Sequence, residues 1–125
     1  MPKDWMLKMI KKSILLLVLA GAPAVADPAS VHHVKVSKSG GAYTFDVTIR
    51  HTDKGWDDYA DVFRIKDPAG NVLGQRDLAH PHVDEQPFTR SLSGVKIPEG
   101  VDTVIVEAHD TVTGWSANVK TVKLP

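Results

Sequence analysis

Cysteine is absent from the 125-residue chain, and all three methionines lie within the first nine residues. Without cysteine, no disulfide can stabilise the fold and no lipid-modified cysteine can anchor the chain. Beyond the first nine residues, a Cu(I) site with thiolate or thioether ligands is also excluded. The fold must therefore depend on an apolar core. A chain well above roughly 40 residues can form such a core without disulfides.

An excess of positive charge is also absent, because 15 basic residues are balanced by 15 acidic ones. Residues 1–26 hold four lysines and one aspartate, which leaves 11 basic and 14 acidic residues in 27–125, a net charge of −3. Such a chain offers no basic stripe to replace the counterions of a nucleic acid. We therefore expect no nucleic-acid partner.

The first 26 residues have the three parts of a secretory signal peptide. A lysine-rich start precedes the apolar run 14–20, and Ala24-Val-Ala26 forms a small-residue cleavage site. The apolar run is shorter than the ~20 residues that a membrane-spanning helix requires. We therefore expect export to the periplasm or the exterior, cleavage after Ala26, no membrane attachment after cleavage, and a single domain over 27–125.

A helical repeat of apolar residues is missing from 27–125, whereas a two-residue alternation is clear. Apolar and polar residues alternate strictly over 42–50, as in a strand with one buried face. The segment 101–109 is rich in β-branched residues and predicts a central, buried strand. The core is expected to contain Tyr43, Phe45, Val47, Ile49, Val104 and Val106.

Weaker strand patterns fill the remaining segments between glycine- and proline-containing turns. They cover 31–37, 59–66, 72–78, 88–92 with or without an extension to 97, and 116–124. About seven short strands at this spacing predict an all-β fold, an antiparallel β-sandwich of immunoglobulin-like type. A small closed barrel is the alternative.

The expected strand order brings the histidines to one end of this sandwich. If successive strands run antiparallel, the loops 51–58, 79–86 and 110–114 share an end, together with the start of the first strand. All six histidines lie in or beside these segments: His32, His33, His51, His80, His82 and His109. The turns at the opposite end contain none.

His80 and His82 are separated by one residue, so both imidazoles leave an extended backbone on the same side. Pro81 restricts the backbone between them, and imidazole ligands suit Zn²⁺ or Cu²⁺. We predict a copper or zinc site with ligands His51, His80, His82 and His109, and with His33, Glu85 and Asp110 as further candidates. The alternative is that His80 and His82 are hydrogen-bonded loop residues.

The acidic segment 51–61 lacks the ligand spacing of an EF-hand loop and is interpreted as a solvated loop covered by a tryptophan. Trp56, Tyr59 and Trp115 fall at the same end as the histidines and are candidate anchors for a periplasmic protein or a glycan. An interaction module is therefore the second functional hypothesis. Catalysis ranks third, because no G-x-S-x-G motif or cofactor fingerprint is present.

The stretch His80-Pro81-His82, followed by Glu85 and Phe88, resembles the H-P-M motif of superoxide reductases and a similar element of thiosulfate-oxidation carrier proteins. The resemblance covers about a dozen residues and implies an immunoglobulin-like sandwich. It does not imply superoxide reduction, because the iron of those enzymes requires a cysteine thiolate. The block from His80 to Arg90 also resembles small exported bacterial proteins of unknown function.

Overall fold

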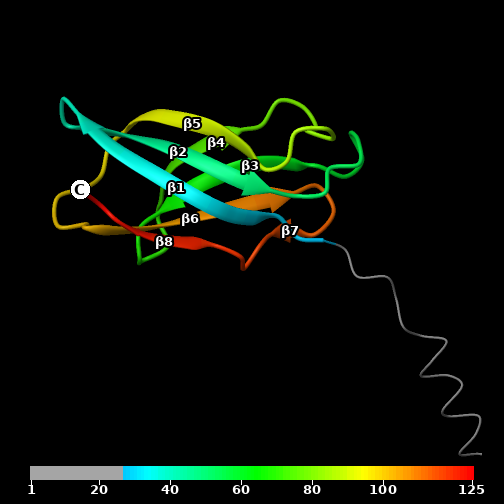
Figure 1. Ribbon diagram of the computed structural model, residues 1–125. Helices are drawn as coiled ribbons and strands as arrows, with labels where there is room; N and C mark the ends of the chain where they lie inside the picture. Colours follow the sequence, from blue (N-terminus) through cyan, green and yellow to red (C-terminus); the bar gives the residue numbers. More distant parts are fainter. Residues whose placement is uncertain (1–26) are drawn as a thin grey trace, which may run out of the picture.

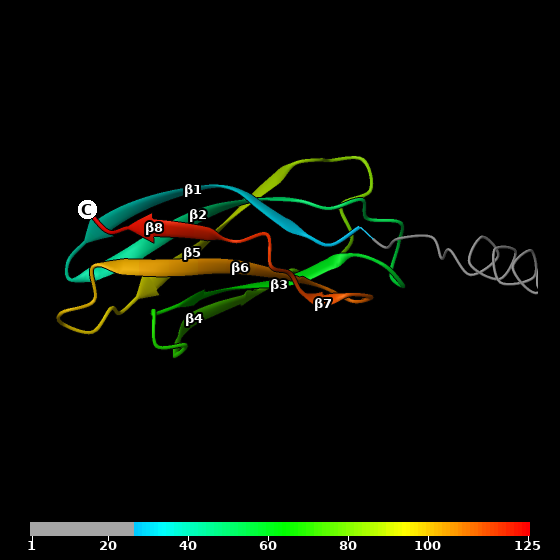
Figure 2. The ribbon, with the colours of Figure 1, turned by 90° about the horizontal axis from the view of Figure 1, so that it is seen from below.

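The computed structural model describes residues 27–125, and the predicted signal peptide lies outside the described residues. Two antiparallel sheets pack face to face (Figures 1 and 2). The first sheet has the order β1-β2-β5, with β1 at Ser30–Ser39, β2 at Ala42–Arg50 and β5 at Phe88–Val95. The all-β sandwich predicted from the alternation is therefore confirmed.

The second sheet has the order β4-β3-β6, and β6 also pairs with β7 and β8. Its strands are β3 (Ala60–Lys66), β4 (Val72–Asp77), β6 (Thr103–Asp110), β7 (Gly114–Trp115) and β8 (Lys120–Lys123). The sandwich thus has eight strands instead of about seven. Residues 27–125 contain no helix, and so none that is long and apolar enough to cross a membrane.

Of the C-terminal strand predicted over 116–124, only Lys120–Lys123 forms a strand, β8, and the short β7 precedes the predicted range. Trp115 pairs with His109 in β7, whereas Lys120 pairs with Val106 in β8, and the register shifts between these two pairs. In between, Ser116 is buried and its N–H donates to Ala108 O at 2.9 Å. The backbone at Asn118 accepts a bond from Val31 N–H at 3.0 Å instead of extending the ladder.

The predicted core is confirmed for five of its six side chains. Phe45, Val47, Ile49, Val104 and Val106 are completely buried between the sheets. The sixth, Tyr43, is only partly buried and packs against the margin of this core. It is the second residue of β2, next to the Gly40-Gly41 turn at the end of the strand.

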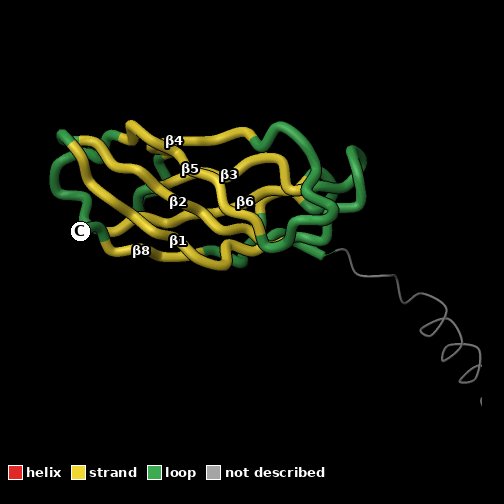
Figure 3. The backbone as a smooth tube through the Cα atoms, turned by 45° about the horizontal axis from the view of Figure 1, so that its top comes forward, coloured by secondary structure: helices red, strands yellow, loops and turns green. Residues whose placement is uncertain are grey.

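Three connecting loops lie together at the end of the sandwich where β2 and β6 finish (Figure 3). They are residues 51–59, 78–87 and 111–113, and we call this end the histidine pole. Main-chain bonds join the loops, for example Thr111 N–H to Tyr59 O at 3.1 Å. The His82 N–H donates to the side chain of Asp53, at Oδ2, over 2.7 Å and so joins the loop 78–87 to the loop 51–59.

Candidate metal centre

The centre of the histidine pole is a buried histidine–aspartate pair. His51 follows β2 directly and is 2% exposed, and Asp53 is 4% exposed. His51 Nδ1 lies 2.6 Å from Asp53 Oδ1, which also accepts the Ala60 N–H at 3.0 Å. Since this oxygen acts as an acceptor, the proton of the pair lies on Nδ1. The other ring nitrogen, Nε2, is therefore directed away from Asp53.

His51 Nε2 faces two further carboxylates. It lies 3.6 Å from Asp58 Oδ1 and 3.6 Å from Asp110 Oδ2. One ligand atom from each of these three residues lies within 4.8 Å of the other two. Within residues 27–125, no other group of three histidine, aspartate or glutamate side chains is as close as this. Asp53 thus lies at Nδ1 of His51, and two further carboxylates, those of Asp58 and Asp110, lie near Nε2.

Asp110 is completely buried at the end of β6. Burial raises the pKa of its carboxyl, but the opposing effects are larger, so the pKa lies below its ordinary value. The pKa is lowered by hydrogen bonds from the side chain and N–H of Thr113 and from the N–H of Val112, and by the nearby His51. The two N–H groups bind Oδ1 at 2.6 and 2.8 Å. Asp110 is therefore a buried anion beside His51 Nε2.

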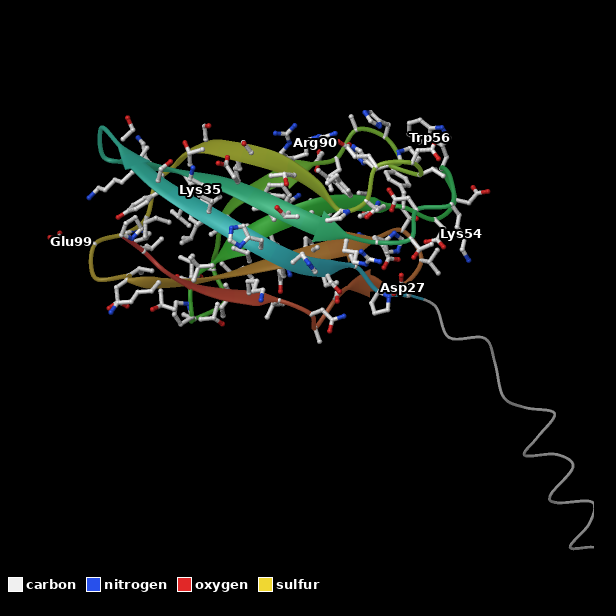
Figure 4. All side chains as sticks on the ribbon, in the orientation of Figure 1. Asp27, Lys35, Lys54, Trp56, Arg90 and Glu99 are labelled. Carbon is white, nitrogen blue, oxygen red and sulfur yellow. The ribbon has the colours of Figure 1, made fainter. Side chains whose placement is uncertain are left out.

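Asp58 is held on the open side of the group, with its side chain 26% exposed. The Asp58 N–H donates to Gly55 O at 3.1 Å, and Asp58 O accepts the Lys54 N–H at 2.8 Å. The Thr111 hydroxyl also donates to Asp57 O at 3.2 Å and thereby ties this turn to the loop after Asp110. Figure 4 shows Lys54 and Trp56, from the same turn, at the tip of the domain.

The two carboxylates favour a positive charge at His51 Nε2. If the ring is neutral with its proton on Nδ1, a lone pair at Nε2 faces two carboxylate oxygens. Buried charges are costly unless they are paired, so a cation among the three groups would be stabilised there.

The His80-Pro81-His82 loop contributes to this centre through its backbone. The His82 N–H donates to Asp53 Oδ2, while Gln86 accepts the His51 N–H at 3.0 Å and donates to His82 O at 2.9 Å. Asp53 therefore receives three hydrogen bonds, from the His51 ring and from the N–H groups of Ala60 and His82. The loop fixes the carboxylate that orients His51.

The imidazoles of His80 and His82 point elsewhere. The ring of His82 stacks on Phe88 at 3.9 Å between centroids, and its Nε2 accepts from Arg90 at 2.9 Å. Its Nδ1 is buried and has no hydrogen-bond partner among the described residues. Burial, and then the charge of Arg90 and the neighbouring His80, lower the pKa of His82 below 6.5. His80 is exposed, with Nδ1 3.0 Å from Pro81 O.

The remaining candidates from the sequence lie outside the group at His51. His109 Nδ1 is 2.5 Å from Asp61 Oδ1, and its ring meets Trp115 edge-on at 5.0 Å. Glu85 accepts from Arg90 at 3.1 Å, and His33 is exposed on β1. Of the predicted ligands, the structure brings together His51 and Asp110.

Among the candidate interaction residues, Trp56 is 67% exposed and its ring lies 5.7 Å from that of Tyr59.

Asp53 and Asp58 were missed as site residues because the segment 51–61 was interpreted as solvated. That interpretation is wrong for Asp53, which is buried. The spacing His51-x-Asp53 was the available signal, because two residues of extended backbone place both side chains on one side. The proximity of Asp58 to Asp110 depends on strand pairing across the second sheet and has no local signal.

A protein of known sequence is similar to this chain. The chain is 40% identical over 95 residues to a protein of Halomicrobium mukohataei named "Putative lipoprotein". The match covers 75% of this chain and 46% of that protein, so the chain spans about half the length of its relative. No family model matches the sequence, and no solved structure matches it.

Proposed function

We propose that this protein binds a divalent metal ion, zinc or copper, through His51 Nε2, Asp58 and Asp110. The observation that carries the proposal is the pair of 3.6 Å separations between Nε2 and the two carboxylate oxygens. Two ligands bound to zinc at about 2.1 Å in tetrahedral geometry lie about 3.4 Å apart. The two separations from His51 Nε2 are therefore close to those expected of ligands of one ion, and the third, between Asp58 and Asp110, is within 4.8 Å.

The bond from His51 Nδ1 to Asp53 supports the same conclusion. A metal-binding imidazole usually donates its other N–H to a carboxylate, which fixes the tautomer and makes the ligating nitrogen more basic. Asp53 is itself fixed by the Ala60 and His82 N–H groups. His51 is thus oriented as a ligand through Nε2 even though no sequence motif marks it.

One imidazole and two carboxylates favour zinc over copper in this site. Cu(I) prefers sulfur ligands, and Cu(II) prefers tetragonal sites. Zinc accepts nitrogen and oxygen ligands and, with three protein ligands, keeps a position open for water or an external molecule. His80, His82 and His109 do not belong to the close group at His51. His82 Nε2 already accepts from Arg90, and the Nδ1 atoms of His80 and His109 lie at Pro81 O and Asp61.

The protein is proposed to act in the cell envelope or outside the cell. The signal-peptide pattern of residues 1–26 supports export. The name of the relative, a lipoprotein, agrees with that location, although this chain contains no cysteine for a lipid anchor. A metal site in this compartment would serve in metal storage, transfer or sensing; we do not propose catalysis.

A second candidate function is protein binding at the histidine pole. Among residues 27–125, five large hydrophobic side chains are exposed. Trp56, Val83 and Val112 lie in the three loops of this pole, and Trp115 lies in β7, directly after the loop 111–113. Exposed aromatic and apolar side chains at one end of a domain are typical of interaction surfaces. A Trp56→Ser change that abolished capture of a partner without altering metal content would favour this function.

The experiment that tests the proposed function is a zinc titration of the purified protein without a histidine tag. Calorimetry at pH 7.5 should give one zinc per chain. Asp58→Asn keeps the volume of the side chain but replaces a carboxylate ligand with a weaker amide ligand. The affinity for zinc should therefore fall by about 100-fold or more, which exceeds the usual effect of changing a residue that only supports a ligand. His80→Asn is the matched control and should leave affinity unchanged. Equal affinity in wild type and Asp58→Asn would contradict the proposal.

A further inference from the structure

A groove separate from the histidine pole runs along one side of the sandwich. It has a volume of about 300 Å³ and lies between β1 and β8. Figures 2 and 3 both show these two strands side by side, each at the margin of its own sheet. The lining consists of His32, His33, Val34 and residues 120–123. None of these residues belongs to the candidate metal centre.

The two strands that form the groove leave their outer edges unpaired. Within the described residues, β1 pairs only with β2 and β8 pairs only with β6. A single bond, Val31 N–H to Asn118 O at 3.0 Å, joins the two segments at one end of the groove. Beyond it, main-chain donors and acceptors of both edges are available, as in sheets that accept an added strand.

The floor and the walls of the groove differ in character. Val34 and Val122 are partly buried and pack against the core, so they form an apolar floor. Lys120, Lys123 and the two exposed histidines form polar walls. The lining contains no carboxylate, and neither β1 nor β8 includes an acidic residue. This groove is therefore basic in a chain whose residues 27–125 have a net negative charge.

We propose that the groove binds an acidic, extended segment of another protein as an added strand. Such a segment would bond to the free edge of β1 or β8, place alternate apolar side chains over Val34 and Val122, and present carboxylates to the lysines. A second copy of this chain fits poorly, because pairing of equivalent edges would bring the lysines of both copies into one interface without a carboxylate on either strand. Charge complementarity thus selects an acidic partner.

The test uses a capped eight-residue peptide of alternating valine and glutamate, with a valine–glutamine peptide as reference. Nuclear magnetic resonance titration should show binding of the acidic peptide, with slowed amide exchange in 32–34 or 120–123. Lys120→Gln with Lys123→Gln should weaken binding by about tenfold at low salt, since each exposed charge pair contributes modestly. Lys54→Gln with Lys96→Gln removes the same charge from exposed positions elsewhere and should leave binding unchanged.

A peptide methylated on alternate backbone nitrogens separates strand addition from simple attraction of an anion. Methylation removes main-chain donors but keeps the carboxylates, so it should abolish the slowed exchange and most of the binding. Equal binding of the methylated peptide, equal binding to the Lys120/Lys123 double variant, or no binding of the acidic peptide would each overturn the proposal. So would a concentration-dependent dimer whose interface is β1, because a second copy would then occupy the groove.

Discussion

Two histidine–aspartate pairs of similar length lie within residues 27–125, and one of them, at His51, has further carboxylates close to the imidazole. His51 Nδ1 and Asp53 Oδ1 are 2.6 Å apart, and His109 Nδ1 and Asp61 Oδ1 are 2.5 Å apart. The side chains of the first pair are 1% and 0% exposed, and those of the second are 26% and 27% exposed. The two pairs therefore differ in their burial and in the further carboxylates beside His51, and not in the histidine–aspartate distance.

The second ring nitrogen shows the difference most clearly. His51 Nε2 faces Asp58 and Asp110, and these two carboxylates favour a cation there. The ring of His109 instead meets Trp115 edge-on, and Trp115 is itself covered by Arg64, whose guanidinium carbon lies 3.6 Å from the ring centroid. The second pair is thus part of an aromatic and charged cluster on the outer sheet face.

The largest expected difference between the pairs is in stability. Asp53→Ala would leave the His51 ring N–H and the N–H groups of Ala60 and His82 without an acceptor in a buried place. We expect the free energy of unfolding to fall by about 3–5 kcal/mol. Asp61→Ala should cost about 0–1 kcal/mol, because that pair is partly exposed. Urea denaturation of both variants measures this, and equal losses would remove the distinction between the pairs.

The next difference is in zinc affinity as a function of pH. If His51 is the one imidazole ligand, one proton competes with the metal, so affinity should fall between pH 7.5 and 5.5 with a limiting slope near one proton per zinc. A slope near two would instead indicate two imidazole ligands, as in the site predicted at His80 and His82. His109→Asn should leave the profile unchanged. Calorimetry at several pH values gives the slope.

Asp110, which has no counterpart beside His109, should affect stability in acid. The pKa of Asp110 in the folded protein lies below its ordinary value of 3.8. The carboxyl of Asp110 therefore binds its proton less tightly in the folded state than in the unfolded state. The stability that ionised Asp110 contributes is present above pH 3.8 and is lost as the pH falls through the lowered pKa. Asp110→Asn should flatten the decline in unfolding free energy below pH 4. An unchanged decline would show that Asp110 does not act as a buried anion.

The smallest expected effect concerns the loop that holds Asp53. The pKa of His82 is lowered below 6.5 by burial and by Arg90, so its contribution to stability is present above pH 6.5 and lost as the pH falls through the lowered pKa. His82→Phe keeps an aromatic ring against Phe88 and removes the titrating group. Melting temperatures between pH 7 and 5 should vary less in this variant than in wild type. The exposed His80→Asn should not show this reduced variation.

The fold could be predicted to a large extent from the sequence, because alternation in β2 reports burial directly. Phe45, Val47 and Ile49 were assigned to the core from period two alone, and all three are buried. The division between β7 and β8 was missed, because it depends on a register shift against β6 that leaves no local pattern.

The candidate site was predicted less well, for a physical reason. His51 and Asp110 were named from their placement at the ends of strands, which topology determines. The direction of each imidazole depends on its hydrogen-bond partners, and Arg90 takes His82 Nε2 while Asp61 takes His109 Nδ1. Asp58 lies near Asp110 only because Ala60 pairs with Asp110 across β3 and β6. Clustering of histidines in the sequence therefore indicated the right end of the molecule but did not identify the ligands.

The most direct test of a metal site at His51 is the state of its two ring nitrogens. Nitrogen–proton correlation spectra of the imidazoles should be recorded at pH 7.5 before and after one equivalent of Zn²⁺. We expect Nδ1 of His51 to keep its proton while the Nε2 resonance shifts on zinc binding, with His80 and His109 unaffected. Protons on both nitrogens of His51 that zinc does not displace would contradict the account, since the cation between the carboxylates would then be the proton.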